Sequence, residues 1–189
     1  MAQVQTQAGE AAVKQPPAFD AEKEITKLWA KCQAAQDEIR RTFFEVREAA
    51  IQMAGAGADP DAITLKAWEV KGKDTAKSYF PRVNVSKPTF VEDIARLFVN
   101  TWRNQGAVVR LEKSENPNEV FIVWDRCPWP TAHKQYGVSM ALDVAGCDHA
   151  LQTTLADVAL FANRKLKIET VKAIPKGQGA CVRRLWLED

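Results

Sequence analysis

The spacing of apolar residues changes near the middle of the chain, and this change restricts the fold more than any other feature. Before about residue 105, apolar residues recur every three or four positions, as on one face of a helix. After it, short segments rich in β-branched and aromatic residues are separated by turn residues. This order favours an α+β fold, because a parallel sheet would need regular strand–helix–strand alternation.

The first helix is predicted over residues 23–53, with Asp20 as its N-cap. The motif AGAGADP at residues 54–60 would end it. Its apolar side chains recur at helical spacing, and we expect Cys32, one of them, to belong to the core. The predicted apolar face consists of Ile25, Leu28, Trp29, Cys32, Ile39, Phe43, Val46 and Ala50.

Two further helices complete the first half. Asp59 or Asp61 would cap a helix that fades near Gly72, and residues 73–87 are expected to form an irregular connection. The third helix would begin near Pro88 and end near Asn104.

The second half is predicted to contain two strand pairs and two helical segments. The strands are expected at residues 107–111, 120–124, 166–173 and 180–187, and helical structure at residues 131–145 and after the N-cap Asp148. We therefore expect an antiparallel sheet of about four strands in two hairpins, packed with about five helices.

These elements divide the chain into three parts within one compact domain. Residues 1–18, rich in Ala, Gln and Gly, are expected to be a disordered tail. Residues 19–104 would form a helical part, and residues 105–189 an α+β part that carries any ligand-binding or catalytic site.

Composition indicates a soluble cytoplasmic protein. The hydrophobic and charged fractions are 46% and 26%, and no stretch approaches the roughly 20 apolar residues of a membrane span. Residues 1–17 lack the apolar region of a secretory signal, so the four cysteines are expected to be free thiols. A net charge of +2 does not indicate a nucleic-acid partner.

Positive charge is concentrated near the C-terminus. Residues 164–184 contain seven basic residues and one acid, Glu169. Such a segment would suit a small anion or an acidic partner, although a solvated strand face is the simpler interpretation.

Three cysteines lie where predicted elements begin or end. Cys127 follows a strand in the motif Arg126-Cys127-Pro128-Trp129, Cys147 precedes the expected cap Asp148, and Cys181 begins the last strand after a glycine-containing turn. A cation or a helix N-terminus next to a thiol lowers its pKa and favours the nucleophilic thiolate.

These cysteines admit three interpretations. They would be small buried hydrophobes, a thiol-based or ligand-binding site, or ligands of zinc or iron with His149 or His133 as a fourth ligand. No paired CxxC motif supports the metal. Likewise Trp124 and Trp129, which flank Cys127, would line a pocket or belong to the core, and the core is the commoner place.

The second half resembles the L-2-amino-thiazoline-4-carboxylic acid hydrolase-like family and, more distantly, the 4-vinyl reductase-like small-molecule-binding domains. The matching motifs are Arg126-Cys127-Pro128-Trp129, Cys147-Asp148 and Gly177-Gln178-Gly179-Ala180-Cys181, within about residues 105–188. Gln178 stands where the family usually has an acidic residue. The resemblance implies an α+β fold, a ligand cavity near the cysteines and, in the family's named member, hydrolysis of a C–N bond.

The sequence therefore favours a hydrolase-like enzyme, or a subunit of one, acting on a small anionic substrate. The expected catalytic residues are Cys127, Cys147, Cys181 and His149. The expected substrate-binding residues are Arg126, Trp129, His133, Lys176 and Arg183. The alternative is a non-catalytic small-molecule-binding module or partner subunit, in which the first helix packs against a second copy or another chain.

Overall fold

The computed structural model describes residues 20–188, so the expected tail at residues 1–18 lies outside the described residues. Within this range the elements follow the predicted order of helices, hairpin, helices and hairpin. They are α1 (Ala21–Ala54), α2 (Pro60–Tyr79), α3 (Phe90–Asn104), β1 (Val108–Lys113), β2 (Glu119–Arg126), α4 (Trp129–Gln135), α5 (Met140–Ala162), β3 (Leu166–Lys172) and β4 (Cys181–Leu187), with short 3₁₀ turns at Gly55–Gly57, Phe80–Arg82 and Ile174–Lys176.

The four strands form one antiparallel sheet in the order β1-β2-β4-β3. Each hairpin contributes two neighbouring strands, and β2 and β4 join the hairpins at the centre of the sheet. The predicted α+β class, with a four-stranded antiparallel sheet, five helices and a long first helix, is confirmed.

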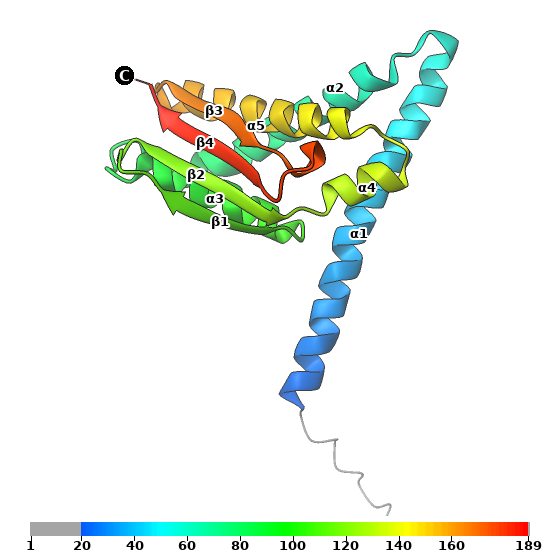
Figure 1. The fold of residues 1–189 in the computed structure, drawn as a ribbon, viewed down its shortest axis with the longest axis horizontal. Coiled ribbons are helices and arrows are strands. Elements are labelled where there is room, and N and C mark those ends of the chain that lie inside the picture. The colour runs from blue at the N-terminus through cyan, green and yellow to red at the C-terminus, as the bar shows by residue number, and fades with distance from the viewer. Residues whose placement is uncertain (1–19, 189) are drawn as a thin grey trace, which may run out of the picture.

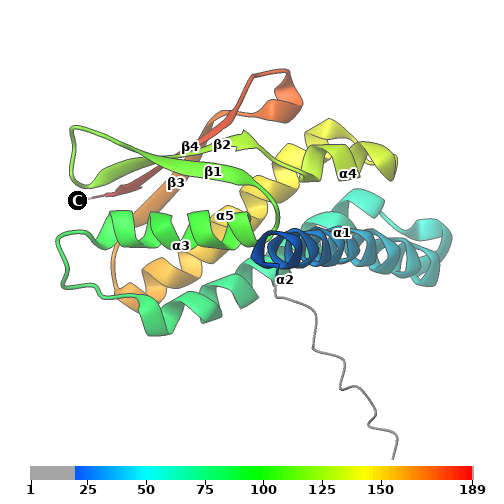
Figure 2. The ribbon, with the colours of Figure 1, turned by 90° about the horizontal axis from the view of Figure 1, so that it is seen from below.

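The helices α3 and α5 cover one face of the sheet, and α2 packs against α5 on the side away from the strands (Figure 2). Two glycines allow α2 and α5 to approach closely. A Cβ on Gly72 would lie 2.7 Å from the carbonyl oxygen of Ala150, and one on Gly146 would lie 2.4 Å from Cδ1 of Trp68. The core therefore continues from the sheet through α5 to the indole of Trp68, which is 1% exposed.

These two glycines explain why two predicted boundaries were wrong. The helix α2 does not fade at Gly72 but runs to Tyr79, through nearly half of the expected irregular connection. The helix α5 begins at Met140 and continues through Gly146, where an end had been predicted. Both glycines serve helix packing and not helix termination.

The predicted helical segment at residues 131–145 is divided in two. The helix α4 ends at Gln135, and Gly137 has a φ of 68°, which favours glycine and breaks the helix. Ser139 then caps α5, because its hydroxyl accepts a hydrogen bond from the backbone N–H of Leu142 at 3.1 Å.

The long helix α1 extends well beyond the rest of the fold (Figure 1). Its predicted cap is confirmed, because a carboxylate oxygen of Asp20 accepts a hydrogen bond from the backbone N–H of Lys23 at 3.1 Å. Only Gln36 and Phe44 of α1 are buried. The expectation that Cys32 belongs to the core is wrong, because its side chain is exposed to solvent.

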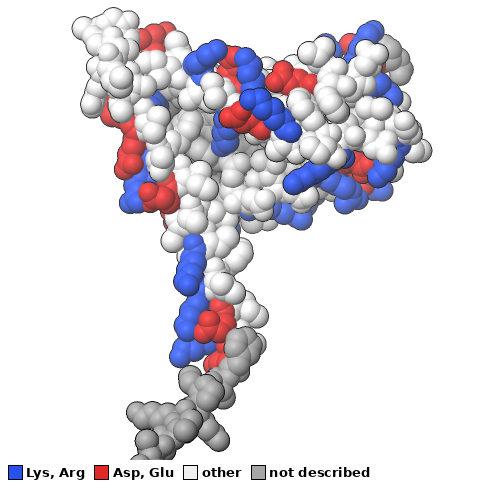
Figure 3. All heavy atoms as spheres, turned by 180° about the vertical axis from the view of Figure 1, so that it is seen from behind, with Lys and Arg blue, Asp and Glu red and all other residues white. Residues whose placement is uncertain are grey.

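Charged side chains are distributed over the surface. On the face seen in Figure 3, basic and acidic groups both occur on the body and on the projecting part of α1. Within residues 20–188, no helix combines the length and the apolar character needed to cross a membrane.

Candidate functional site

Six of the nine sequence-predicted site residues lie in three places. Cys147, Cys181 and Arg183 are in the layer between the sheet and α5. Arg126 and Cys127 lie at the end of β2, beside a surface hollow. Lys176 is exposed in the turn before β4.

Arg183 is the centre of the inner group. Although it carries a charge, it is 2% exposed, because its position in β4 faces the helices. Its Nη2 lies 3.0 Å from a carboxylate oxygen of Asp148 and 3.6 Å from Sγ of Cys147, and its Nη1 donates to the carbonyl oxygen of Lys172 at 3.2 Å. The guanidinium is therefore held by the fold itself, with only Nε lacking a partner.

The thiols of Cys147 and Cys127 do not have the setting that activates a cysteine. Cys147 lies within α5, so the prediction that it precedes a helix N-terminus is wrong. Burial raises the pKa of the Cys147 thiol to about 12, although Arg183 opposes the shift. Burial also raises the pKa of Cys127, with a further contribution from Cys147. Both thiols are therefore protonated near neutral pH, and a protonated thiol is a poor nucleophile.

The structure gives no support to a metal site at the cysteines. Although Cys127, Cys147 and Cys181 influence one another electrostatically, no three His, Cys, Asp or Glu side chains within residues 20–188 are grouped so that they would hold a metal ion. Sγ of Cys181 instead accepts a hydrogen bond from the backbone N–H of Ile174 at 3.1 Å.

The two histidines have different surroundings. His133, in α4, is 0% exposed, and its Nε2 lies 3.5 Å from a carboxylate oxygen of Asp143. Burial lowers the pKa of His133 to about 4 and raises the pKa of Asp143 to about 7. His149 is partly exposed, with Nε2 4.0 Å from a carboxylate oxygen of Glu69 on α2. Neither histidine has a hydrogen bond to any of the three cysteines.

Trp129 belongs to the core, which the sequence analysis gave as the commoner place for such a tryptophan. It is 2% exposed and contacts Trp68 and Phe43, with ring centroids 4.7 and 5.4 Å away. Its indole N–H donates to Oε1 of Gln105 at 3.1 Å. Trp124 is buried as well.

Lys71 is a functional candidate that the sequence analysis missed. Its Nζ lies 4.3 Å from the ring centroid of Trp129, 4.5 Å from that of Trp68 and 5.8 Å from that of Trp102, and it donates to Oε1 of Gln105 at 3.0 Å. No carboxylate pairs with it among the described residues. The three-residue spacing of Trp68 and Lys71 on a helix was the available signal.

Lys71 is expected to react with amine reagents at an unusually low pH. Desolvation lowers its pKa to about 8, so half of this amine is neutral near pH 8. Lys73, two residues away in α2, is the matched control, because its ion pair with Glu69 raises its pKa. Competitive labelling with acetic anhydride, read by mass spectrometry, should show Lys71 acetylation rising through pH 8 and that of Lys73 rising later. Equal profiles would contradict the assignment.

A surface hollow of about 450 Å³ lies where β2 ends against α1 and α4. Gly106 makes room for α1 here, because a Cβ would lie 2.7 Å from Oε1 of Gln36. Arg40 donates to the carbonyl oxygen of Gln105 at 2.8 Å and pairs with Asp37. The lining residues are Gln33, Gln36, Asp37, Arg40, Gly106, Arg126, Cys127, Pro128, Thr131, Ala132 and Gln135.

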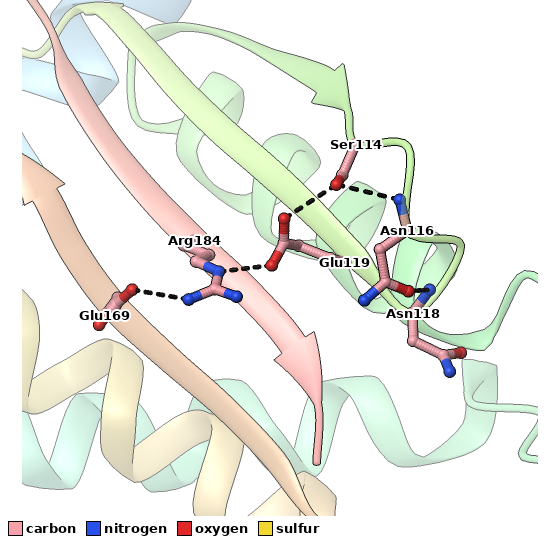
Figure 4. A network of polar contacts seen from close by, with 6 residues as sticks. All are labelled: Ser114, Asn116, Asn118, Glu119, Glu169 and Arg184. Atoms are coloured by element: carbon pink, nitrogen blue, oxygen red, sulfur yellow. Dashed lines mark hydrogen bonds and ion pairs between the residues drawn. The ribbon is translucent and has the colours of Figure 1, made fainter. Parts of the chain in front are cut away.

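The basic C-terminal hairpin does not present a free cluster of arginines. Arg184 lies between two acids, with Nε bonded to Glu119 at 2.5 Å and Nη1 to Glu169 at 3.3 Å (Figure 4). Ser114 also donates to Glu119, at 2.9 Å. With Arg183 paired inside the fold, the two arginines of β4 are already occupied.

Comparison with known proteins identifies the fold and no family. No protein-family model and no curated protein sequence matches the chain. Among solved structures, it is similar to a trafficking protein particle complex subunit 3 from Naegleria fowleri covalently bound to palmitic acid, with 14% identity over 83% of this chain and 97% of that chain and a TM-score of 0.51. At this identity the similarity shows the fold alone.

Two other solved structures are more distant. The phenol-responsive sensory domain of the transcription activator PoxR is 7% identical over 78% of this chain and 74% of that chain, with a TM-score of 0.49. An H-NOX protein from S. oneidensis is 13% identical over 96% and 84%, with a TM-score of 0.39.

Proposed function

We propose that the chain is a small-molecule-binding module whose ligand carries a carboxylate and occupies the hollow beside Arg126 and Cys127. The observation that carries this proposal is the hollow itself, with two arginines on its wall. Its volume of about 450 Å³ falls within the roughly 300–1,000 Å³ typical of small-ligand sites.

The charge around the hollow favours an anion. Arg126 is exposed and, within residues 20–188, has no hydrogen-bond or ion-pair partner among the side chains. Its guanidinium is thus available for two parallel hydrogen bonds to a carboxylate. Arg40 is paired with Asp37 and contributes a second cation to the wall.

Lys71 adds to the positive field behind this wall. Its ammonium group and the guanidinium group of Arg40 repel each other, which contributes to the lowered pKa of Lys71. A carboxylate between the two cations would relieve this repulsion. Such a ligand would therefore raise the pKa of Lys71 when it binds.

The remainder of the hollow suits a modest apolar group. Pro128 and Ala132 lie on its wall, and the protonated Cys127 thiol behaves as a small, weakly polar group. The Naegleria fowleri subunit with this fold holds palmitic acid covalently, so an organic acid bound to such a fold has a precedent.

The hydrolase-like alternative has no comparable support. Its nucleophiles, Cys127 and Cys147, have raised pKa values, and His149 has no hydrogen bond to either thiol. We therefore prefer binding over catalysis. We also infer that the module works within an oligomer or a complex, since most of α1 is left exposed.

Arg126→Gln is expected to weaken carboxylate binding about tenfold or more, because it removes a charge-assisted bidentate contact worth roughly 1.5–3 kcal/mol. Benzoate, phenylacetate and octanoate, each with its uncharged amide, serve as probes. Binding is measured by isothermal titration calorimetry on the full chain.

Arg82→Gln is the matched control, because Arg82 is also exposed but lies away from the hollow, in the turn after α2. The proposal expects at least one acid to bind more tightly than its amide, and only Arg126→Gln to remove that preference. If acids and amides bind alike, or neither binds, the proposed ligand class is wrong.

A further inference from the structure

The helix α1 presents an uncovered seam with the spacing of a coiled coil. Apolar residues, and one threonine, recur at alternating intervals of three and four positions along its 34 residues, and every position of this seam is exposed. The first set, seven residues apart, is Ile25, Cys32, Ile39, Val46 and Met53, and the second is Leu28, Ala35, Thr42 and Ala49.

The fold of the chain itself uses another face of α1. Gln36 donates to the carbonyl oxygen of Asn104 at 3.1 Å, and Arg47 donates to the hydroxyl of Thr64 at 2.6 Å. Phe44 is buried on the same side. The seam therefore lies beside the contact with the body and is not consumed by it.

The exposure of this seam is large for a soluble helix. Ile25, Leu28 and Val46 are 66%, 63% and 62% exposed. Contiguous apolar surface of this kind marks an interaction site. The seam spans about four heptads, the length at which the pattern indicates a coiled coil.

We propose that α1 pairs with α1 of a second copy of this chain in an antiparallel coiled coil. In the matching register, Ile25 lies opposite Ala49 and Ile39 opposite Ala35 of the second copy. These two layers each combine one large and one small side chain, while Leu28 lies opposite Val46 and Cys32 opposite Thr42, so no layer opposes two alanines. A parallel pair would instead oppose alanine to alanine in two layers.

One charged pair beside the seam favours this register, although the register also brings the two Glu38 side chains, each paired with Arg41 of its own chain, near each other at the two-fold axis. Lys31, which has no ion pair among the described residues, would lie opposite Glu45 of the second copy, and the two-fold symmetry repeats the contact. In a parallel pair, Lys31 would face Gln36, which is uncharged and already bonded to Asn104. In this register, the N-terminal half of α1, which projects from the body, also lies along the C-terminal half of α1 in the second copy, which contacts the body.

Light scattering of the full chain tests the pairing. The wild type is expected to be a dimer, and Ile39→Asp a monomer with unchanged helical circular dichroism, because Ile39 is 56% exposed in the single chain. Ala30→Asp is the control, because Ala30 lies on the opposite side of α1 and is exposed. This control costs more intrinsic helix propensity than Ile39→Asp, so a dimeric Ala30→Asp excludes helix loss as the cause.

The measurement is made at about 50 μM, a protein concentration above the dissociation constants of ordinary dimers. A wild type that is monomeric at this concentration would overturn the proposal. So would a dimer that survives both Ile39→Asp and Leu28→Asp.

Disulfide formation tests the direction of the pair. The antiparallel register places Thr42 opposite Cys32, whereas the two Cys32 residues are offset by about 15 Å along the axis at about 1.5 Å per residue. Because Cys32 is the exposed cysteine of the four, mild oxidation with diamide should cross-link Thr42→Cys and leave the wild type uncross-linked. Cys32→Ser combined with Thr42→Cys should not cross-link. A Cys32–Cys32 disulfide in the wild type would show a parallel pair and overturn the register.

Discussion

Asp148→Ala is expected to lower the free energy of unfolding by about 3 kcal/mol or more, because it leaves a buried cation without its counter-charge. Arg183 is 2% exposed and lies 3.0 Å from the carboxylate of Asp148. The other acceptors near its terminal nitrogens, the sulfur of Cys147 and the carbonyl oxygen of Lys172, are uncharged at neutral pH and cannot replace the lost carboxylate. Urea denaturation followed by circular dichroism measures the change.

Glu169→Ala is the matched control for this prediction. Glu169 also pairs with an arginine of β4, Arg184, but this pair is exposed to solvent and Arg184 keeps its contact with Glu119. Exposed pairs contribute roughly 0–1 kcal/mol. Equal losses in the two variants would mean that burial of Arg183 does not govern its pairing energy.

Trp68→Ala is expected to cost about 3–5 kcal/mol, because it removes a buried aromatic side chain from the contact between α2 and α5. The indole of Trp68 is 1% exposed, packs on Phe43 and Trp129, and fills the space left open at Gly146. Calorimetry or urea denaturation gives the loss.

Val70→Ala, in the same helix, should change stability by less than about 0.5 kcal/mol, because Val70 is 50% exposed. Trp68→Ala should also abolish the low-pH labelling of Lys71, since it removes one of the indoles that enclose the amine. A stable Trp68→Ala variant with unchanged labelling would show that this cluster is not a cooperative unit.

Local signals predicted most of the secondary structure. The caps Asp20 and Asp59 both accept hydrogen bonds from their helices, and the two strand pairs form the expected hairpins. Such features depend on residues a few positions apart, so they are visible in the sequence.

Features that depend on partners distant in the chain could not be predicted in this way. Gly72 and Gly146 resemble helix ends, yet each lies at a helix crossing whose other side comes from a remote segment. Cys32 has core-like spacing, but its side chain is exposed within the described residues 20–188. A periodic apolar face indicates that a helix is covered, without indicating whether its own chain or another does so.

The candidate site was predicted in part. The end of β2 at Arg126-Cys127 was correctly placed at a junction between elements, and it lies on the hollow. The aromatic enclosure of Lys71 was not foreseen, because Trp68, Trp102 and Trp129 come from three different helices. Arg183 faces the helices because side chains in β4 point alternately to the two faces of the sheet. The sequence interpretation counted the basic residues of this segment and did not consider this alternation.

Chemical-shift mapping of an isotope-labelled sample titrated with octanoate and octanamide tests the proposed binding site most directly. The account predicts that octanoate shifts the backbone amides of Gly106, Arg126 and Cys127 in the wild type, that octanamide has a weaker effect, and that Arg126→Gln removes the difference. Octanoate shifts confined to other surfaces, or identical maps for the acid and the amide, would contradict it.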